Sequence, residues 1–310
     1  MRASRGIYYL PEELNRLFIM LANKPNVSNL CLLEAYSDTL YQDILKQYII
    51  KPENISIYSQ YTQGCPEEYN ANADFLHEPY LNKQKKLALF DLIFSVIPFG
   101  LSASVKFKFE EDLYNRFWRG NPNQDKMDFV YISHIVETLK NDGKAVVICP
   151  TSVLSRMGKD TNIRKKLILE NVLEAVIMLP EKFLSSMSFS SVILVFNKKK
   201  TDTDILFIDA SKDFEKIKGK NNLRPQDIDK IYNYYKNAES KSGYSKKVSV
   251  NEIKDNNFSL GVQLYVKENE TAKNIDLKAL EADISAIEDE LAKVRLDLKK
   301  SLAELGGVNA

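Results

Sequence analysis

The sequence contains few of the residues from which disulfide frameworks and metal sites are built. Only three cysteines and two histidines occur among 310 residues, and Cys31, Cys65 and Cys149 lie far apart in the chain. Disulfide-rich domains need several regularly spaced cysteines, and zinc sites need a close set of Cys or His ligands. We therefore expect no disulfide framework, no metal centre and a reducing, cytoplasmic environment.

Long apolar runs and net charge are also missing. The first residues have no apolar stretch typical of a secretion signal, and no segment approaches the roughly eighteen apolar residues of a membrane span. Forty-three Lys and Arg balance forty-two Asp and Glu, which leaves a net charge of +1. We therefore expect neither a secreted nor a membrane-spanning protein, and any contact with nucleic acid has to be local.

What the sequence does have is an alternation of short apolar strands with amphipathic helices. Hydrophobic residues make up 44% and charged residues 27% of the chain, as in folded proteins with a sizeable core. We predict strands at 29–35, 54–59, 90–97, 144–149, 172–178, 192–197 and 205–209, and helices at 11–22, 38–48, 129–139 and 163–169. This alternation predicts an α/β fold with a doubly wound, mostly parallel sheet. The last two strands are expected to form an antiparallel hairpin at its edge.

The chain changes character twice after the last of these strands. From Asp213 it becomes polar and rich in Lys and Asn, and no further strand is expected. Near the end, apolar residues recur at alternating steps of three and four, at Leu277, Leu280, Ile284, Ile287, Leu291, Val294 and Leu298. This regularity predicts a coiled-coil helix whose narrow seam binds a partner helix, and docking onto its own domain is the alternative.

These patterns divide the chain into three parts. We expect an α/β domain at 1–212 with an inserted loop at 101–127, a polar helical or irregular extension at 213–272, and the coiled-coil helix at 273–310. The inserted loop is basic and contains Lys106, Lys108, Arg116, Trp118 and Arg119. Basic side chains beside an aromatic ring can follow phosphates and stack on a base, so these five are candidate contacts to double-stranded DNA. A solvated loop is the alternative, since acidic residues lie in the same stretch.

Several ordered segments of the second half resemble a known family. Residues 139–150, 163–167, 173–180, 193–198 and 206–211 are similar, in order and spacing, to the modification (M) subunit of type I restriction-modification systems, an N6-adenine DNA methyltransferase. The resemblance implies a Rossmann-like fold of the S-adenosylmethionine-dependent methyltransferase type. It covers nearly the whole chain, but the family's usual N-terminal helical domain is expected to be absent. Autonomous DNA binding should then be weak.

The resemblance places the family's catalytic motif at Val96, Ile97, Pro98 and Phe99. In the family an Asn-Pro-Pro-aromatic motif holds a flipped-out adenine, because the Asn side chain accepts a hydrogen bond from its amine and the ring stacks on the base. Valine has no acceptor, so Phe99 alone keeps its role. For Val96 and Ile97, packing within the strand is the alternative role.

The positions that the resemblance assigns to the methyl donor also depart from the family. Its glycine-rich turn after the first strand lets the backbone approach the donor, whereas residues 34–37 contain no glycine. An acidic residue for the ribose is replaced by Tyr61, and a threonine near the donor's carboxylate by Leu10. Asp74 fits the acidic residue near the adenine moiety, or else caps a turn. The equivalent positions are Leu10, Glu34, Tyr36, Ser37, Tyr61 and Asp74.

Departures at several positions that serve one ligand and one reaction predict a chain that does not methylate and needs no cofactor. The leading hypothesis is a non-catalytic M-like scaffold or DNA-binding component of a restriction-modification or related defence complex. Its coiled coil would bind a specificity-type subunit or a second M-like chain. One alternative is an active adenine N6-methyltransferase with an atypical or partner-completed site, which would bind S-adenosylmethionine. Another is a stand-alone DNA-binding module.

Overall fold

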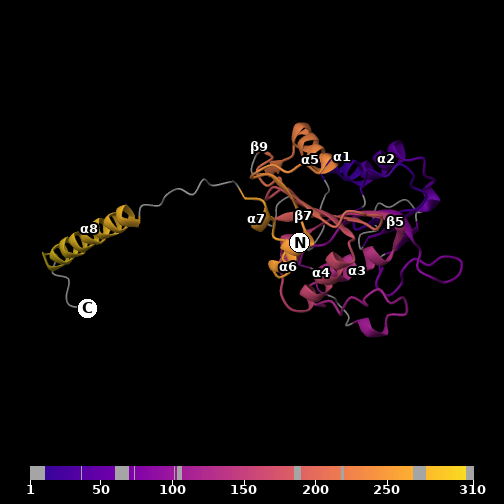
Figure 1. Cartoon of the computed structure of the whole chain (residues 1–310), viewed down its shortest axis with the longest axis horizontal. Coiled ribbons are helices and arrows are strands. Elements are labelled where there is room, and N and C mark those ends of the chain that lie inside the picture. Colours follow the sequence, from indigo (N-terminus) through magenta and orange to yellow (C-terminus); the bar gives the residue numbers. More distant parts are fainter. Residues whose placement is uncertain are drawn as a thin grey trace. The chain divides into compact units, whose positions relative to one another are not determined.

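The computed structural model describes residues 11–35, 37–59, 70–72, 74–100, 102, 107–184, 190–217, 220–267 and 277–304. The chain divides into two compact units, Met1–Glu268 and Asn269–Ala310. The first unit is built on one large sheet, and the described part of the second is the helix α8, Leu277–Glu304 (Figure 1). Among the described helices, none combines the length and the apolar character needed to cross a membrane.

Among the described residues, the large sheet of the first unit has nine strands in the order β11-β8-β6-β7-β5-β4-β1-β2-β3. Strands β3, β2, β1, β4 and β5 run parallel to one another in that order, and β6 runs parallel to β8. Strand β7 is antiparallel to β5 and β6, and β11 is antiparallel to β8. The strands are β1 (Leu30–Leu33), β2 (Ile55–Tyr58), β3 (Asn70–Asn72), β4 (Phe90–Val96), β5 (Leu139–Pro150), β6 (Leu173–Met178), β7 (Ser191–Asn197), β8 (Ile205–Asp209) and β11 (Ser245–Val248).

Helices cover both faces of this sheet, which confirms the predicted doubly wound, mostly parallel α/β fold (Figure 1). On one face pack α1 (Glu12–Ala22), α2 (Asp38–Gln47) and α5 (Pro225–Asn237). On the other pack α3 (Asp128–Glu137), α4 (Lys159–Leu169), α6 (Val250–Asp255) and α7 (Val262–Tyr265). Short 3-10 helices lie at Pro52–Asn54, Phe109–Glu111 and Thr151–Leu154.

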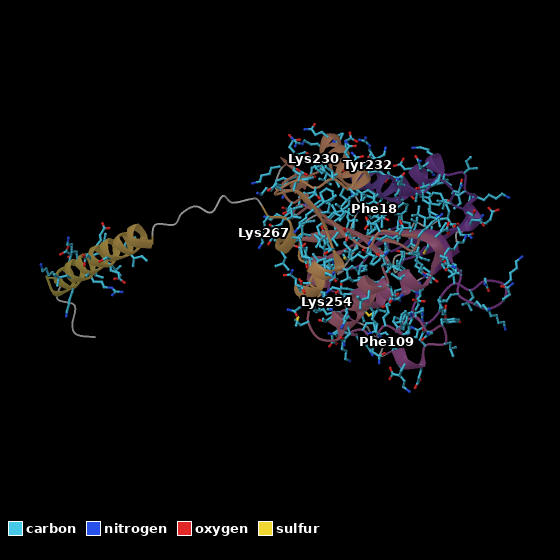
Figure 2. The ribbon with its side chains drawn as sticks, viewed as in Figure 1. Phe18, Phe109, Lys230, Tyr232, Lys254 and Lys267 are labelled. Carbon is cyan, nitrogen blue, oxygen red and sulfur yellow. The ribbon has the colours of Figure 1, made fainter. Side chains whose placement is uncertain are left out.

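Two hydrophobic cores result, because successive residues of a strand point to opposite faces. In β1, Leu30 and Leu32 join the core beneath α1 and α2, while Cys31 and Leu33 join the core beneath α3. Phe18 of α1 stacks on Phe94 of β4 with ring centroids 5.4 Å apart, and it lies between helix and sheet (Figure 2).

Two expectations about the sheet are wrong. Strands β7 and β8 do not form an edge hairpin, since β7 lies between β5 and β6 and β8 pairs in parallel with β6. Strand β7 is buried along nearly its whole length, as an interior strand with apolar side chains on both faces has to be. Strands also continue beyond Asp213: β9 (Glu215–Ile217) and β10 (Lys220–Asn222) form a separate ribbon, and β11 extends the large sheet at β8.

The polar segment after residue 213 is thus tied to the first unit rather than appended to it. Strand β11 is an edge strand in which buried Ser245 and Val248 flank two solvent-accessible lysines, so its composition does not look apolar. Helix α5 buries Ile228 and Ile231 in the core beneath α1. The helix α8 follows as a continuous helix, in agreement with the predicted final helix, whereas its pairing in a coiled coil stays a prediction.

Residues 141–143, between the predicted helix at 129–139 and the predicted strand at 144–149, lie within β5. Helix α3 already ends at Glu137, where the Thr138 hydroxyl donates to the carbonyl of His134 at 2.8 Å. The register then shifts, with Phe90 opposite Leu139 and Leu92 opposite Lys144. At this irregularity the β5 backbone at Gly143 comes close to the backbone of Lys140 in the same strand.

Glycine is required at position 143 by this close approach. A Cβ atom there would lie 2.9 Å from the Lys140 nitrogen and 2.9 Å from the Phe90 carbonyl oxygen, and backbone atoms cannot easily move aside. We expect Gly143→Ala to lower the free energy of unfolding by about 1–3 kcal/mol in urea denaturation. The matched control is Gly261→Ala, whose Cβ would meet its nearest neighbour at 3.5 Å. Equal stability of the two variants would contradict this account.

Candidate functional site

The carboxyl ends of β1, β2 and β4 bring the predicted site residues to one edge of the sheet. Leu33 of β1 lies opposite Tyr58 of β2 on one side and Ser95 of β4 on the other. The turn after β1 and the motif at the end of β4, distant in sequence, are therefore neighbours. In doubly wound sheets this edge is where ligands bind.

The motif at the end of β4 is built into the protein interior. Val96 and Ile97 are 3% and 0% exposed, and the Ile97 amide donates to the Ile148 carbonyl at 2.9 Å. Their side chains enter the two opposite cores, and partly buried Phe99 packs against the same core as Val96. Pro98 is buried too. Strand packing, the alternative role of Val96 and Ile97, is thus what the structure shows, and neither side chain has a hydrogen-bonding atom.

The turn after β1 keeps a backbone shape that favours glycine but carries other residues. Glu34 has a φ of 55°, in the left-handed region, and its amide donates to the Tyr58 carbonyl at 2.7 Å. Its carboxylate accepts a hydrogen bond from the Tyr131 hydroxyl at 3.3 Å. Ser37 caps α2, since its hydroxyl accepts from the Leu40 amide at 3.1 Å. Leu10, Tyr36 and Tyr61 lie outside the described residues.

Asp74 acts as a turn cap. Its carboxylate accepts hydrogen bonds from the amides of Leu76 and His77 at 3.1 and 3.0 Å, and it contacts the His77 ring nitrogen at 2.7 Å. Partial burial alone would raise the pKa of Asp74, but the hydrogen bonds from His77 outweigh it and lower the pKa below its ordinary value. The carboxylate is therefore ionised at neutral pH and organises the turn.

Buried aromatic rings fill the space beside these turns. Tyr58, Phe75 and Tyr131 are 1%, 5% and 0% exposed. The ring centroids of Phe75 and Tyr131 are 4.5 Å apart, and those of Tyr58 and Tyr80 are 4.3 Å apart. Burial raises the pKa of the Tyr58 hydroxyl, so it stays protonated. We call Tyr58, Phe75, Tyr80 and Tyr131 the edge aromatic cluster.

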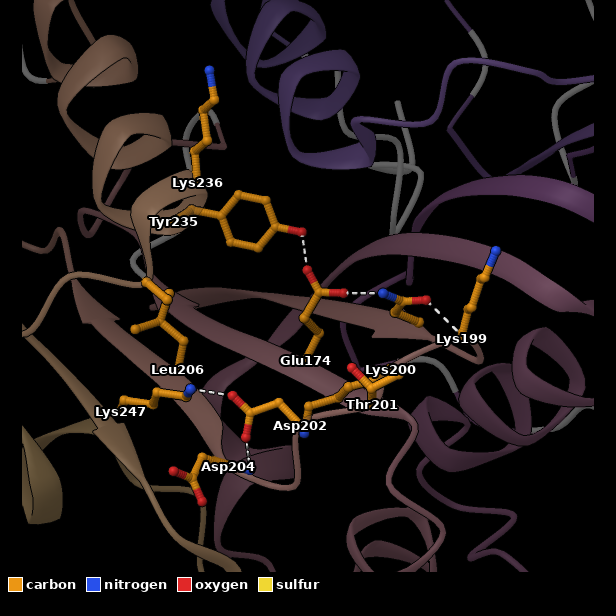
Figure 3. Close-up of a pocket in the computed structure, with 12 residues that line it drawn as sticks. Glu174, Lys199, Lys200, Thr201, Asp202, Asp204, Leu206, Tyr235, Lys236 and Lys247 are labelled. Atoms are coloured by element: carbon orange, nitrogen blue, oxygen red, sulfur yellow. Dashed lines mark hydrogen bonds and ion pairs between the residues drawn. The ribbon is translucent and has the colours of Figure 1, made fainter.

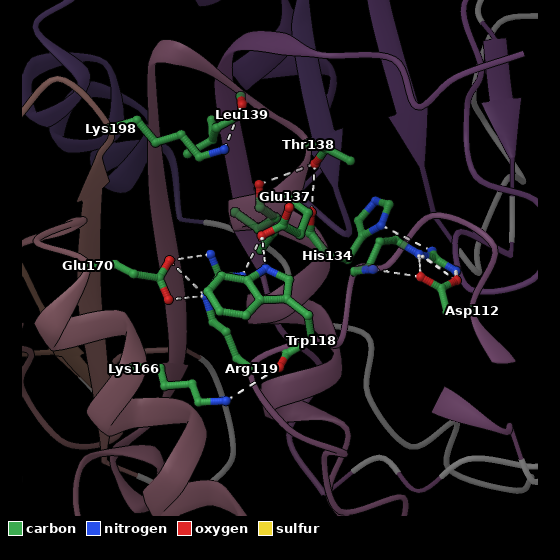
Figure 4. A network of polar contacts seen from close by, with 12 residues as sticks. Asp112, Trp118, Arg119, His134, Glu137, Thr138, Leu139, Lys166, Glu170 and Lys198 are labelled. Carbon is green, nitrogen blue, oxygen red and sulfur yellow. Dashed lines mark hydrogen bonds and ion pairs between the residues drawn. The ribbon is translucent and has the colours of Figure 1, made fainter. Parts of the chain in front are cut away.

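The inserted loop reaches this cluster through a buried arginine. Arg116 is 1% exposed, and its guanidinium donates to the carbonyls of Phe75 and Leu76 at 2.8 and 2.7 Å. It pairs with Asp112 at 2.7 Å and lies 3.3 Å from His134 Nδ1 (Figure 4). Burial, and then the charge of Arg116, lower the pKa of His134 well below its ordinary value, so the ring is neutral. Arg116 thus anchors the loop to the Asp74 turn.

Arg119, the second arginine of the inserted loop, also forms its ion pairs inside the fold. Arg119 is 3% exposed and pairs with both Glu137 and Glu170 (Figure 4). The Trp118 indole donates to Glu137 at 3.0 Å, and its ring lies 4.6 Å from the Arg119 guanidinium carbon.

These contacts restrict the predicted DNA surface of the loop. Because their guanidinium groups serve internal contacts, Arg116 and Arg119 do not support the predicted contact to phosphates. Lys108, paired with Glu111 at 2.8 Å, and half-exposed Trp118 remain accessible, and Lys106 lies outside the described residues.

A different hollow, of about 320 Å³, lies at the opposite edge, where β6 and β8 begin (Figure 3). Lysines and carboxylates both line it: Lys247 binds Asp202, and Glu174 lies 3.2 Å from Lys144, which is outside the lining. The Tyr235 hydroxyl contacts Glu174 as well. The hollow therefore offers no concentrated charge of one sign. Within the described part of the chain, no group of His, Cys, Asp and Glu is arranged to hold a metal ion.

Comparison with known proteins identifies the family. The family model described as N-6 DNA Methylase matches residues 66–274. The chain belongs to the N-6 DNA methylase family. The type I restriction enzyme MpnII methylase subunit of Mycoplasma pneumoniae is 26% identical to this chain over an alignment of 339 positions. The alignment covers 97% of this chain and 60% of that protein. The MjaVII methylase subunit of Methanocaldococcus jannaschii is 34% identical over 173 residues, or 54% of this chain and 30% of that one.

Solved structures agree with this assignment. A type I restriction-modification methyltransferase subunit from Streptococcus thermophilus superposes with a TM-score of 0.74 at 25% identity, over 86% of this chain and 60% of that chain. The EcoKI M protein superposes with a TM-score of 0.61 at 13% identity, over 94% and 73%, which shows the fold alone. The predicted Rossmann-like methyltransferase fold and M-subunit likeness are confirmed. The chain spans at most 60% of the length of the two curated relatives above.

The edge aromatic cluster of this methylase-family chain was not singled out from its sequence. Tyr58, Phe75 and Tyr131 belong to three different segments, and isolated aromatic residues in apolar stretches are ordinary core residues. Only the parallel register of β1 and β2, together with the packing of α3, brings them to the turn at Glu34.

We expect Arg116 of the inserted loop to be essential for the stability of the fold. Arg116→Ala would leave the Asp112 carboxylate, 3% exposed, buried without its ion-pair partner, and should lower the free energy of unfolding by roughly 3–5 kcal/mol. Lys108→Ala removes an exposed pair in the same loop and should change stability by only about 0.5 kcal/mol. Chemical denaturation of both variants measures the difference. A small loss with Arg116→Ala would show that the guanidinium is not a structural anchor.

Proposed function

We propose that this chain is an M-subunit-like protein that no longer transfers a methyl group and acts as a scaffold in a restriction-modification or related defence complex. The observation that carries the proposal is the interior character of the motif at the end of β4. Adenine methylation needs a side-chain acceptor for the exocyclic amine, and Val96 presents only methyl groups, 3% exposed, to an apolar core.

S-adenosylmethionine is the methyl donor that this fold implies, and the described residues at the carboxyl edge do not fit it. The turn that would let the donor approach the backbone carries Glu34 instead of glycine, and this carboxylate is engaged by Tyr131. Ser37 is used to cap α2, and Asp74 to cap a turn. The edge aromatic cluster takes up the adjoining space. These features support loss of donor binding.

Assembly with other proteins is the role that remains. The curated relatives are named as methylase subunits of type I restriction enzymes, and subunits act within complexes. Within its own unit, α8 exposes a stripe of apolar residues, Ile284, Ile287, Leu291, Val294 and Leu298. We propose that this stripe binds a specificity-type subunit or a second M-like chain in the cytoplasm, with double-stranded DNA held in the complex.

Donor binding is the direct test of the proposed inactivity. Isothermal titration with S-adenosylmethionine up to about 1 mM should give no saturable heat, because the edge lacks the donor's contacts. A family member with an intact Asn-Pro-Pro-aromatic motif, titrated in parallel, controls for the quality of the donor. Saturable binding at micromolar concentration would refute the proposal and favour an active enzyme with an atypical or partner-completed site.

Deletion of residues 276–310 tests the assembly role. We expect the truncated chain to lose co-purification with its partner, because the apolar stripe of α8 is removed. Its melting temperature should stay within about 2 °C of the full chain, since α8 belongs to a separate compact unit. Unchanged complex formation would contradict the assembly role. A large fall in melting temperature would instead favour docking of α8 on its own domain.

A further inference from the structure

We infer that α8 pairs with a helix of a different chain whose apolar seam is bordered by basic side chains, and not with a second copy of itself. The inference rests on the proposed assembly role and specifies the chemistry of the partner. It depends on how charges are distributed around α8, Leu277–Glu304.

The apolar stripe of α8 is narrow and exposed along its described length. Its side chains at Ile284, Ile287, Leu291, Val294 and Leu298 are 49–64% exposed. Apolar residues three and four positions apart form one line along a helix, which has the width of a coiled-coil seam and buries itself against one or more helices. Leu296 is similarly exposed, at 55%, but lies off this line.

The residues that border the stripe are mostly acidic. In the heptad pattern, the positions next to the seam are occupied by Glu288 and Arg295 on one side and by Glu290 and Asp297 on the other. From residue 284 onward, the lysines of α8 are Lys293, Lys299 and Lys300, which lie on the far side of the helix. The seam therefore has a negative border although the helix as a whole carries both signs of charge.

Charges at these bordering positions select the partner of a coiled coil. In a parallel pair of identical α8 helices, Glu290 would meet Arg295, but Glu288 and Asp297 would gain no basic partner. In an antiparallel pair each border faces its own copy, so the side with Glu290 and Asp297 would meet only acids. A helix with lysine or arginine at its bordering positions satisfies all three acids in either case.

Two synthetic helical peptides with the same Leu/Ile seam test the inference with the full chain. One carries lysine and the other glutamate at the bordering positions. By fluorescence anisotropy, the basic peptide should bind at least about tenfold more tightly than the acidic one, and the difference should shrink at high salt. The chain alone should sediment as a monomer over the same concentration range.

Matched variants distinguish the contribution of the seam and its bordering charges to peptide binding from general effects of a substitution on α8. Glu290→Lys should reduce the preference for the basic peptide at least about threefold, whereas the neighbouring Asp289→Lys, the same charge change off the seam, should not. Leu291→Ala should weaken binding of the basic peptide, and Leu296→Ala should leave it unchanged.

Equal binding of both peptides, binding of neither, or self-association through α8 would each overturn the inference. Such a result differs from failure of the proposed function, which is decided by donor titration and by co-purification of the chain without residues 276–310.

Discussion

Burial of the central strands on both faces is the constraint on which the first unit depends. All of β4, Phe90–Val96, is buried, and its apolar side chains are divided between two cores, one on each face of the sheet. Helices must therefore cover both sides of the sheet, and each connection has to return across it. The same burial continues to the end of the strand. It leaves Val96 and Ile97 as packing residues at the carboxyl edge, where the proposed function places the former catalytic motif.

Interior charges in this protein hold segments together. Arg116 joins the inserted loop to the turn at Asp74, and Arg119 joins it to α3 and to the end of α4 through Glu137 and Glu170. Both guanidinium groups are shielded from water and paired with carboxylates, which makes them effective anchors and poor ligands for phosphate. On α8 the described charged side chains are exposed, and in the proposed pairing their arrangement around the seam selects the partner.

The chain has the scaffold of the N-6 DNA methylase family, and its carboxyl edge carries Glu34, the edge aromatic cluster and Val96. The strand order and the parallel register that place ligands at this edge are kept. In the proposed function, the positions that would contact a donor or a base are taken by a glutamate, buried aromatic rings and a valine. The proposed loss of methyl transfer is compatible with the kept fold, because packing of the cores does not require the polar groups of a site.

The sequence by itself determined the elements whose signal is local. The repeats of α1 and α8, the apolar run of β4 and the absence of glycine at the β1 turn are readable from neighbouring residues, because helix and strand periodicities repeat within a few positions. Only tertiary structure decided that β7 inserts between β5 and β6, that polar β11 extends the sheet, and that Arg116 lies inside. Each of these depends on partners far away in sequence, such as β8 for β11 and Phe75 for Arg116. Pairing and burial between residues so far apart produce no periodic pattern in the sequence.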